Sequence, residues 1–554
     1  MKFQAIYCLC LLILSASFGI CSGTIINVKK PEWRTEFTEV SIEIDPGVGR
    51  LRGSARLTIF NTNSNKGDIS LILNRELNIL LVKYENGQVL SFERDSLSLI
   101  IHSPETRFKK DTFNLYVEYE GSFTERVPEL NFLEAWIGPE ISYALYSSRW
   151  YPVVNGTDYR SKGKITIHVP IDWNVTCSGK LSEEKLLENH KVFVFEINSP
   201  VKYSFAAAPF KFLRNKIDGL EMGVYLLNGD LNKAKFYLEN SFEIVGFLKE
   251  YYGVFPYEGY SLVEIPQDLL GNAGGGSYEG LTFYMPGLFP DKVFYTPSFG
   301  HEIGHIWWSD YIRSPEGPVI NEGLAQMSMG LYLEHVFGEK IFRILLKNGS
   351  LELQLWQTAR LYFQFISPAD PGKQLLPGIL HGDDMKLGIN IPDKRQSLHT
   401  LANSKGFFIY FMLRDLIGSE AFREGLRSTM TSFAWSSDLT LNDLRHKFER
   451  ASGKNLRWFF DQWFFRKGAP EFSISYDIKN RKQNYQVIGV INQVREVYRV
   501  NAEIVFVNGS TREIRNVEIS GKKTPFSFVL QFQPDTVLFD PDYKILRWTE
   551  EFKN

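Results

Sequence analysis

The hydrophobic pattern of the chain changes period twice, and this change constrains its fold more than any other feature. Up to about residue 212, apolar and polar residues alternate, as in segment 55–59, which is the pattern of half-buried antiparallel strands. Between residues 213 and 468 apolar residues recur at helical spacing, as in segment 238–245. From residue 469 the alternation returns. The pattern predicts a multidomain α+β protein.

Four segments follow from this pattern and from the composition of the N-terminus. For 554 residues, about 150 residues per domain gives three to four domains. We expect a signal peptide over 1–23, an N-terminal antiparallel β domain over 24–212, a mostly helical domain over 213–468, and a C-terminal β domain over 469–554. Within the helical segment, one helix is expected to end at Gly253 and another to begin at Thr440, with Asp443 completing a cap.

The first 21 residues have the layout of a secretory signal. Lys2 is followed by an apolar run over 3–14 and then by small residues. We therefore expect an exported protein, secreted or periplasmic, with lipid anchoring through Cys21 as the alternative. No later stretch approaches about 20 uninterrupted apolar residues, so no integral membrane span is expected. Cys177 is the remaining cysteine of the mature chain, and we interpret it as a buried small hydrophobe.

The charge balance gives no reason to expect a polyanionic partner. Lys plus Arg is 62 and Asp plus Glu is 64, a formal net charge of −2, and neither sign forms a long run. We expect no nucleic acid ligand. The composition, with 44% hydrophobic residues, indicates a globular chain, and it carries no signal for an oligomeric state.

A metal-binding pattern lies in the helical segment, where His301-Glu302-Ile303-Gly304-His305 places two imidazoles one helical turn apart. Positions i and i+4 share a helix face, so both rings can reach one ion at about 2.0 to 2.1 Å. A tetrahedral catalytic zinc needs a third protein ligand and keeps one position open for water. Glu322, separated from His305 by 16 intervening residues, is the best carboxylate. Glu316 and Glu334 are alternatives that we interpret as loop and helix surface.

The wider sequence resembles the aminopeptidase N family of zinc metallopeptidases, which are gluzincins. In that family His-Glu-x-x-His is followed by Asn-Glu-Gly-Phe-Ala, and Asn321 to Ala325 matches this motif except for Leu324. The resemblance implies a thermolysin-like catalytic domain over 213–468 and a small C-terminal β-sandwich over 469–554. It also implies one Zn²⁺ per chain held by His301, His305 and Glu322, with Glu302 as the general base. The family usually has eighteen intervening residues, so the loop here is two residues shorter.

The substrate-binding motif of the family has a counterpart upstream of the histidines. Gly276-Ser277-Tyr278-Glu279-Gly280 resembles Gly-Ala-Met-Glu-Asn, with three substitutions. The resemblance implies that Glu279 holds the free α-amino group of a peptide substrate, with Gly276 and Tyr278 beside it. From the residues alone we expect a flexible glycine-rich turn that enters an exposed strand, whose free backbone groups can pair with an extended peptide.

Two positions depart from the family pattern in ways that bear on catalysis. Asn403 occupies the position of a tyrosine that donates a hydrogen bond to the oxyanion, and losing such a donor typically costs about 10² to 10³ in kcat. His381, His399 or Tyr410 could substitute, although surface or core is the better interpretation for each. Met329 stands where many members carry an acidic residue near the metal.

These features together predict a secreted zinc-dependent aminopeptidase that hydrolyses N-terminal residues from peptides. The resemblance covers residues 30–554 and leaves no room for the large helical C-terminal domain of many members. Two alternatives remain open. Asn403 and the altered Glu279 motif favour a catalytically weak member that acts as a peptide-binding or regulatory protein. The third possibility is a zinc endopeptidase or another zinc hydrolase.

Overall fold

The structure is a computed structural model that forms two compact units. One unit comprises residues 1–246 and 255–294, and the other comprises 247–254 and 295–554. The expected signal peptide, Cys21 and His381 lie outside the described residues. The structure describes residues 33–61, 67–102, 112–128, 130–155, 159–217, 219–271, 275–288, 296–316, 318–340, 342–343, 386–388, 398–399, 401–547 and 550–553.

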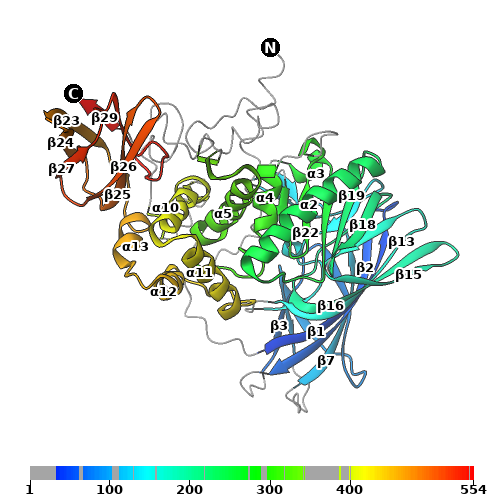
Figure 1. Ribbon diagram of the computed structural model, residues 1–554. Helices are drawn as coiled ribbons and strands as arrows, with labels where there is room; N and C mark the ends of the chain where they lie inside the picture. Colours follow the sequence, from blue (N-terminus) through cyan, green and yellow to red (C-terminus); the bar gives the residue numbers. More distant parts are fainter. Residues whose placement is uncertain are drawn as a thin grey trace. The chain divides into compact units, whose positions relative to one another are not determined.

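The first unit is built on a seven-stranded sheet (Figure 1). The alternation predicted for segment 55–59 is confirmed, because Ala55, Leu57 and Ile59 are buried while the residues between them are partly exposed. The first strand pairs antiparallel with the second and parallel with the strand that contains Ile165. In spatial order the strands are β15 (Lys180–Leu186), β16 (His190–Val201), β13 (Ser161–Pro170), β1 (Trp33–Asp45), β2 (Arg50–Asn61), β7 (Thr112–Gly121) and β4 (Leu77–Tyr84).

Three smaller sheets complete the β region up to residue 208. Cys177 lies in one of them and is buried, in agreement with its interpretation as a small hydrophobe. The first sheet is β10 (Ala135–Ile137), β11 (Ser142–Ala144), β17 (Phe205–Ala208) and β14 (Asn174–Cys177). The second is β12 (Val153–Val154), β3 (Ile69–Ile72), β6 (Ser98–Ile101) and β5 (Phe92–Asp95), and the third is β8 (Arg126–Val127) and β9 (Phe132–Leu133). The short helix η2 (Tyr146–Ser148) precedes β12.

The segment predicted to be mostly helical begins with strands. A five-stranded sheet has the order β18 (Lys211–Ile217), β19 (Leu220–Leu226), β20 (Gly259–Glu264), β22 (Leu281–Tyr284) and β21 (Gly275–Ser277). Helix α2 (Leu231–Tyr252) makes the crossover between the parallel strands β19 and β20. As expected, α2 ends at Gly253, whose φ of 79° suits glycine. The short helices α3 (Gln267–Leu270) and η3 (Pro286–Leu288) flank β21 and β22.

The prediction of an exposed strand after the glycine-rich turn is wrong. Every residue of β21 and β22 is buried. Although β21 lies at one edge of its sheet, pairing with β22 and side-chain packing cover it. Tyr278 contributes to this cover, because its ring lies 5.6 Å from that of Phe283. A period-two pattern identifies a strand, but tertiary packing decides whether both faces are covered.

Helices form the first part of the second unit. The Thr440 side chain accepts a hydrogen bond from Asp443 N–H, and the Asp443 carboxylate accepts one from Thr440 N–H, so the predicted capping box is confirmed.

None of the described helices is long and apolar enough to cross a membrane. In the described part of this unit the helices are α4 (Thr296–Gly304), α5 (Pro318–Phe337), the π-helical turn η6 (Ala402–Gly406), α10 (Phe407–Ile417), α11 (Ser419–Ser432), α12 (Leu441–Ser452) and α13 (Arg457–Trp463).

After α13 the described residues form the two sheets of the predicted β-sandwich. One sheet is β27 (Lys523–Leu530), β24 (Asn484–Gln493), β23 (Phe472–Arg481) and β29 (Glu550–Lys553), and the other is β26 (Thr511–Ile519), β25 (Val500–Asn508) and β28 (Thr536–Phe539).

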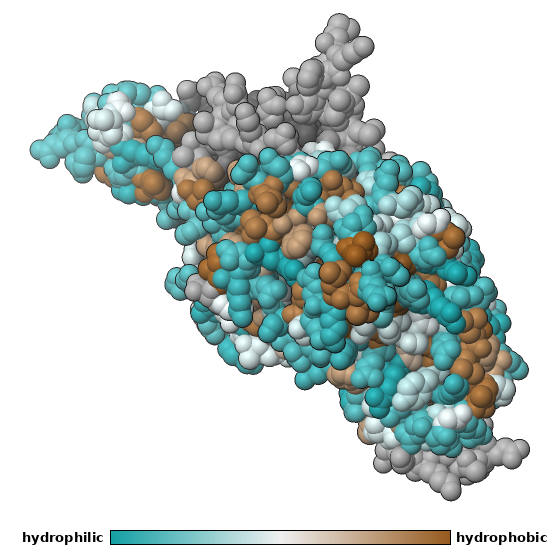
Figure 2. Space-filling model, turned by 90° about the vertical axis from the view of Figure 1, so that its right-hand side faces the viewer, coloured by the Kyte–Doolittle hydropathy of each residue, from teal (hydrophilic) through white to brown (hydrophobic). Residues whose placement is uncertain are grey.

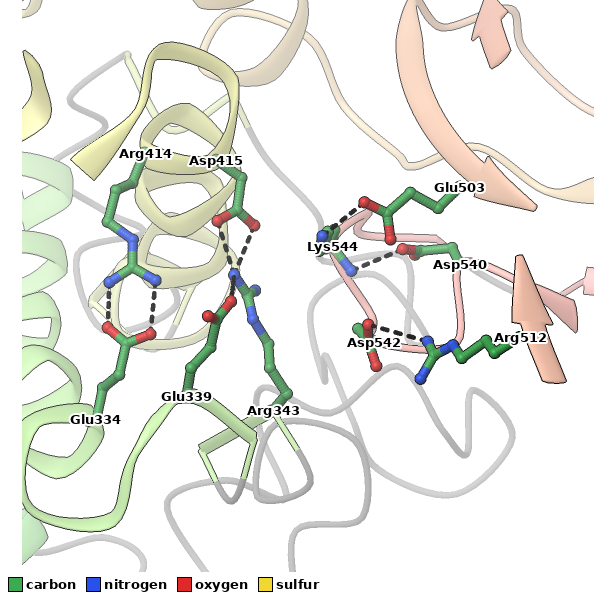
Figure 3. A network of polar contacts seen from close by, with 10 residues as sticks. All are labelled: Glu334, Glu339, Arg343, Arg414, Asp415, Glu503, Arg512, Asp540, Asp542 and Lys544. Atoms are coloured by element: carbon green, nitrogen blue, oxygen red, sulfur yellow. Dashed lines mark hydrogen bonds and ion pairs between the residues drawn. The ribbon is translucent and has the colours of Figure 1, made fainter. Parts of the chain in front are cut away.

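Ion pairs lie along the helices of this unit and along the chain that follows β28 (Figure 3). Arg343 binds Asp415 of α10 at 2.7 Å, and Arg414 pairs with Glu334 of α5. Lys544 binds Glu503 of β25 at 2.7 Å. Figure 2 shows that the hydrophobic residues on the face it presents form small groups separated by hydrophilic ones, as is usual for a folded protein surface.

Candidate metal centre

Helices α4 and α5 cross at very short range because α4 carries glycine at two positions that face α5. A Cβ atom on Gly304 would lie 2.7 Å from the carbonyl oxygen of Ala325, and a Cβ on Gly300 would lie 3.2 Å from Met329. Glycine therefore permits an approach that any side chain would prevent. Met329, predicted as a lost polar contact near the metal, is a buried apolar residue of this crossing.

This crossing brings the three predicted metal ligands together. The Nε2 atoms of His301 and His305 are 3.1 Å apart, and Glu322 Oε2 lies 3.5 Å from the first and 3.6 Å from the second. Their ligand atoms all lie within 4.8 Å of one another, and the three residues are at most 1% exposed. Glu316 instead accepts a hydrogen bond from Leu441 N–H, and Glu334 pairs with Arg414.

The backbone after α4 orients one of the imidazoles. The helix is assigned only to Gly304, but the amide of His305 still donates to His301 O at 3.2 Å, so the helical spacing extends to the second histidine. His305 Nδ1 lies 2.9 Å from the carbonyl oxygen of Trp308 and donates to it, which leaves the lone pair of Nε2 for a metal ion. The indole of Trp308 is held in turn by Tyr252.

The pKa values of the two carboxyl groups at this centre, Glu322 and Glu302, are shifted in opposite directions. Burial alone would raise the pKa of Glu322, but the neighbouring imidazoles of His399, His305 and His301 outweigh it and hold that pKa well below its ordinary value. Burial, together with the negative charge of Glu322, raises the pKa of Glu302 well above its ordinary value. Burial also lowers the pKa of His305 and so favours its neutral, ligating form.

The donor set fits a divalent metal ion. Two imidazole nitrogens and one carboxylate oxygen are a usual set for catalytic zinc. In the absence of an ion, His301 Nδ1, Glu302 Oε2 and Glu322 Oε1 are buried without a hydrogen-bond partner among the described residues. Unpartnered polar atoms at this depth are costly unless a ligand or water completes them, which is the signature expected of a metal site.

Two further side chains lie beside Glu322 and come from the segment that ends in the π-helical turn η6. Asn403 Nδ2 lies 3.5 Å from Glu322 Oε2, and His399 Nδ1 lies 3.6 Å from the same oxygen. The two residues also contact each other, with Asn403 Nδ2 3.1 Å from His399 Nε2. From the sequence, a surface or core position was expected for His399. Its spacing of four residues from Asn403 was the available signal. Tyr410 is buried and donates to Val319 O.

The residues predicted to bind substrate lie in the first unit, and Glu279 is surrounded there by cations. Its carboxylate accepts from Arg160 Nε at 3.1 Å and from the backbone amide of Lys202 at 2.7 Å, and Lys202 Nζ lies 3.1 Å away. Glu279 has 0% exposure and a φ of 41°, a strained value for a residue with a side chain. Gly276 and Tyr278 are buried beside it. The substrate amine predicted to bind Glu279 would therefore compete with two internal cations.

Comparisons with known proteins point to the same chemistry. Residues 298–463 match the model of the peptidase family M1 domain. The chain is 19% identical over 492 residues to probable aminopeptidase 2 of Sulfurisphaera tokodaii, covering 85% of this chain and 57% of that protein. It is 23% identical over 351 residues to aminopeptidase M1 of Arabidopsis thaliana, covering 60% of this chain and 37% of that protein. The chain thus spans between about a third and just over half of these relatives.

A solved structure has a similar fold. The crystal structure of Legionella pneumophila aminopeptidase A in complex with aspartic acid matches with a TM-score of 0.69 and 16% sequence identity, over 95% of this chain and 60% of that chain. At this identity the match establishes the fold.

Proposed function

We propose that this chain, whose residues 298–463 match the peptidase family M1 domain, is a zinc-dependent aminopeptidase that hydrolyses N-terminal residues from peptides. The single observation that carries the proposal is the buried cluster of His301, His305 and Glu322, whose ligand atoms converge within 4.8 Å. Zinc is the metal that this donor set favours, and three protein ligands leave one position for water.

The chain supplies the remaining groups for hydrolysis next to this cluster. When bound, zinc supplies a Lewis acid that polarises the scissile carbonyl and activates water. Glu302, buried and with an unpartnered Oε2, takes the proton of the attacking water and passes it to the leaving amine. Its raised pKa, caused by burial, suits a group that must hold this proton during the reaction. Asn403, at the position of the family's oxyanion tyrosine, has its amide nitrogen 3.5 Å from Glu322 Oε2.

One observation favours a second candidate, a zinc peptidase that does not require a free N-terminus. An aminopeptidase needs an anion to select the substrate's α-ammonium, and Glu279, the predicted anion, is already bound to Arg160 and Lys202. If those ion pairs persist when substrate binds, discrimination against blocked peptides is lost. The two candidates share the metal centre and differ in substrate selection.

The test compares matched peptides that differ only at the N-terminus. A panel of short peptides is offered with free and with acetylated α-amino groups, and each product is identified by mass spectrometry. An aminopeptidase releases single N-terminal residues from the free series alone. Internal cleavage of both series at similar kcat/KM supports the endopeptidase candidate. If zinc-loaded protein cuts neither series, both peptidase candidates are contradicted. The remaining interpretation is then a protein that binds peptides without cleaving them.

A further inference from the structure

Glu322 needs hydrogen-bond donors other than the metal histidines. Its side chain has 0% exposure, and a buried carboxylate is stable only when it is paired and hydrogen-bonded. A histidine that binds a metal through Nε2 directs the lone pair of that atom at the ion, so this atom donates no proton to the neighbouring carboxylate. Among the described residues, His399 and Asn403 also lie close to Glu322 Oε2, at 3.6 Å and 3.5 Å.

The contact between Asn403 and His399 fixes which nitrogen of His399 carries a proton. Asn403 Nδ2 is an amide donor and lies 3.1 Å from His399 Nε2, so Nε2 must accept. The proton of the neutral imidazole is then on Nδ1, the atom that faces Glu322 Oε2 at 3.6 Å. A shift of about 0.5 Å brings this pair within ordinary hydrogen-bond distance. In both contacts a donor therefore faces an acceptor. Asn403 donates to His399, and His399 Nδ1–H points at the Glu322 carboxylate.

His399 is placed to donate rather than to bind the ion itself. The group of ligand atoms that converge within 4.8 Å consists of His301, His305 and Glu322 in the described part of the chain, and His399 is not in it. The imidazole is largely buried, with a side-chain exposure of 10%. Asn403 lies in η6, and π-helical turns are rare and frequent at functional sites.

We propose that His399 is a positioning residue of the metal centre: its Nδ1–H holds the Glu322 carboxylate in the orientation that binds the ion, and Asn403 fixes the imidazole. The inference rests on the proposed metallopeptidase function and adds to it a residue outside the ligand set. It also gives Asn403 a structural role in place of a tyrosine. Partners of this kind typically change metal affinity or activity by about 10- to 100-fold when removed.

The experiment measures zinc affinity by competition with a chromophoric chelator, so it does not depend on peptidase activity. His399→Phe keeps the ring volume and removes the donor, and we expect zinc to bind about 10- to 100-fold more weakly. His399→Gln returns an amide donor and is expected to recover part of the loss. His335→Phe is the matched control, since His335 stacks on Phe247 with ring centroids 4.6 Å apart, away from the metal ligands. Circular dichroism checks that each variant folds.

X-ray absorption of the zinc-loaded variants separates a positioning residue from a ligand. We expect two imidazoles on the ion in wild type and in His399→Phe alike. Loss of an imidazole in His399→Phe would make His399 a ligand, and an unchanged zinc affinity would reduce it to a packing residue; either result overturns the proposal. If the wild-type chain binds zinc with the expected affinity but cuts no peptide, the proposed function fails while the role of His399 is still tested.

Discussion

At the scale of single residues, the metal centre divides two buried carboxylates into different roles. Glu302 and Glu322 are both at most 1% exposed, yet their pKa values move apart because imidazoles surround Glu322 whereas burial and negative charge surround Glu302. When their environments shift the pKa values of two acids in opposite directions, the two acids usually have different catalytic roles. In the proposed reaction, Glu322 stays an anion and Glu302 exchanges a proton.

This division predicts the behaviour of Glu302→Gln. The amide keeps the size of the side chain but takes no proton from water, so kcat is expected to fall by about 10² to 10⁴. Zinc content is expected to stay unchanged, because Glu302 is not among the converging ligand atoms. Steady-state kinetics and elemental analysis of the same preparation check both statements. A variant that retains kcat would remove Glu302 from the reaction.

Glu279 invites a prediction about stability. If its carboxylate serves mainly as the partner of Arg160 and Lys202, Glu279→Gln leaves buried positive charge behind and costs about 3 to 5 kcal/mol of unfolding free energy. A carboxylate kept only for a substrate amine would cost little when replaced. Urea unfolding of the variant without substrate distinguishes these two roles of Glu279. A free energy of unfolding equal to that of wild type would contradict a stabilising role of the internal ion pairs.

At the scale of elements, the crossing of α4 and α5 determines whether the ligands can meet. The sequence motif specifies that His301 and His305 share a helix face, because that depends on local spacing alone. It does not reveal that Gly304 meets the backbone of Ala325, because this fit joins two helices. The same distinction explains why the Thr440 capping box was predictable from nearby residues, whereas the burial of β21 and the position of His399 depend on distant ones.

Gly304→Ala tests the crossing. An added Cβ would lie 2.7 Å from the carbonyl oxygen of Ala325, so the helices must separate at a cost of about 1 to 3 kcal/mol, and zinc affinity is expected to fall with it. The matched control is Gly246→Ala in α2, where a Cβ meets nothing within 4 Å. Alanine there is expected to stabilise by about 0.5 to 1 kcal/mol, because it is the better helix former. Similar thermal unfolding of the two variants would contradict the close crossing.

At the scale of the whole molecule, the predicted groups are divided between the two compact units. The second unit contains the three predicted metal ligands together with Glu302, His399 and Asn403. The first unit contains the predicted substrate residues Glu279, Gly276 and Tyr278. The family match over 298–463 covers the metal-binding part, which is also the part whose motif is best preserved. The substrate motif is more altered in sequence, and its glutamate is the residue whose surroundings differ most from the expectation.

A zinc titration of the metal-free chain is the sharpest test of a zinc-dependent aminopeptidase. Release of N-terminal residues from an unblocked peptide is followed while zinc is added in steps. We expect no release without metal, and a rise in proportion to added zinc that stops at one ion per chain. Release by metal-free protein, or one tightly bound zinc per chain with no release from any free peptide, would contradict it.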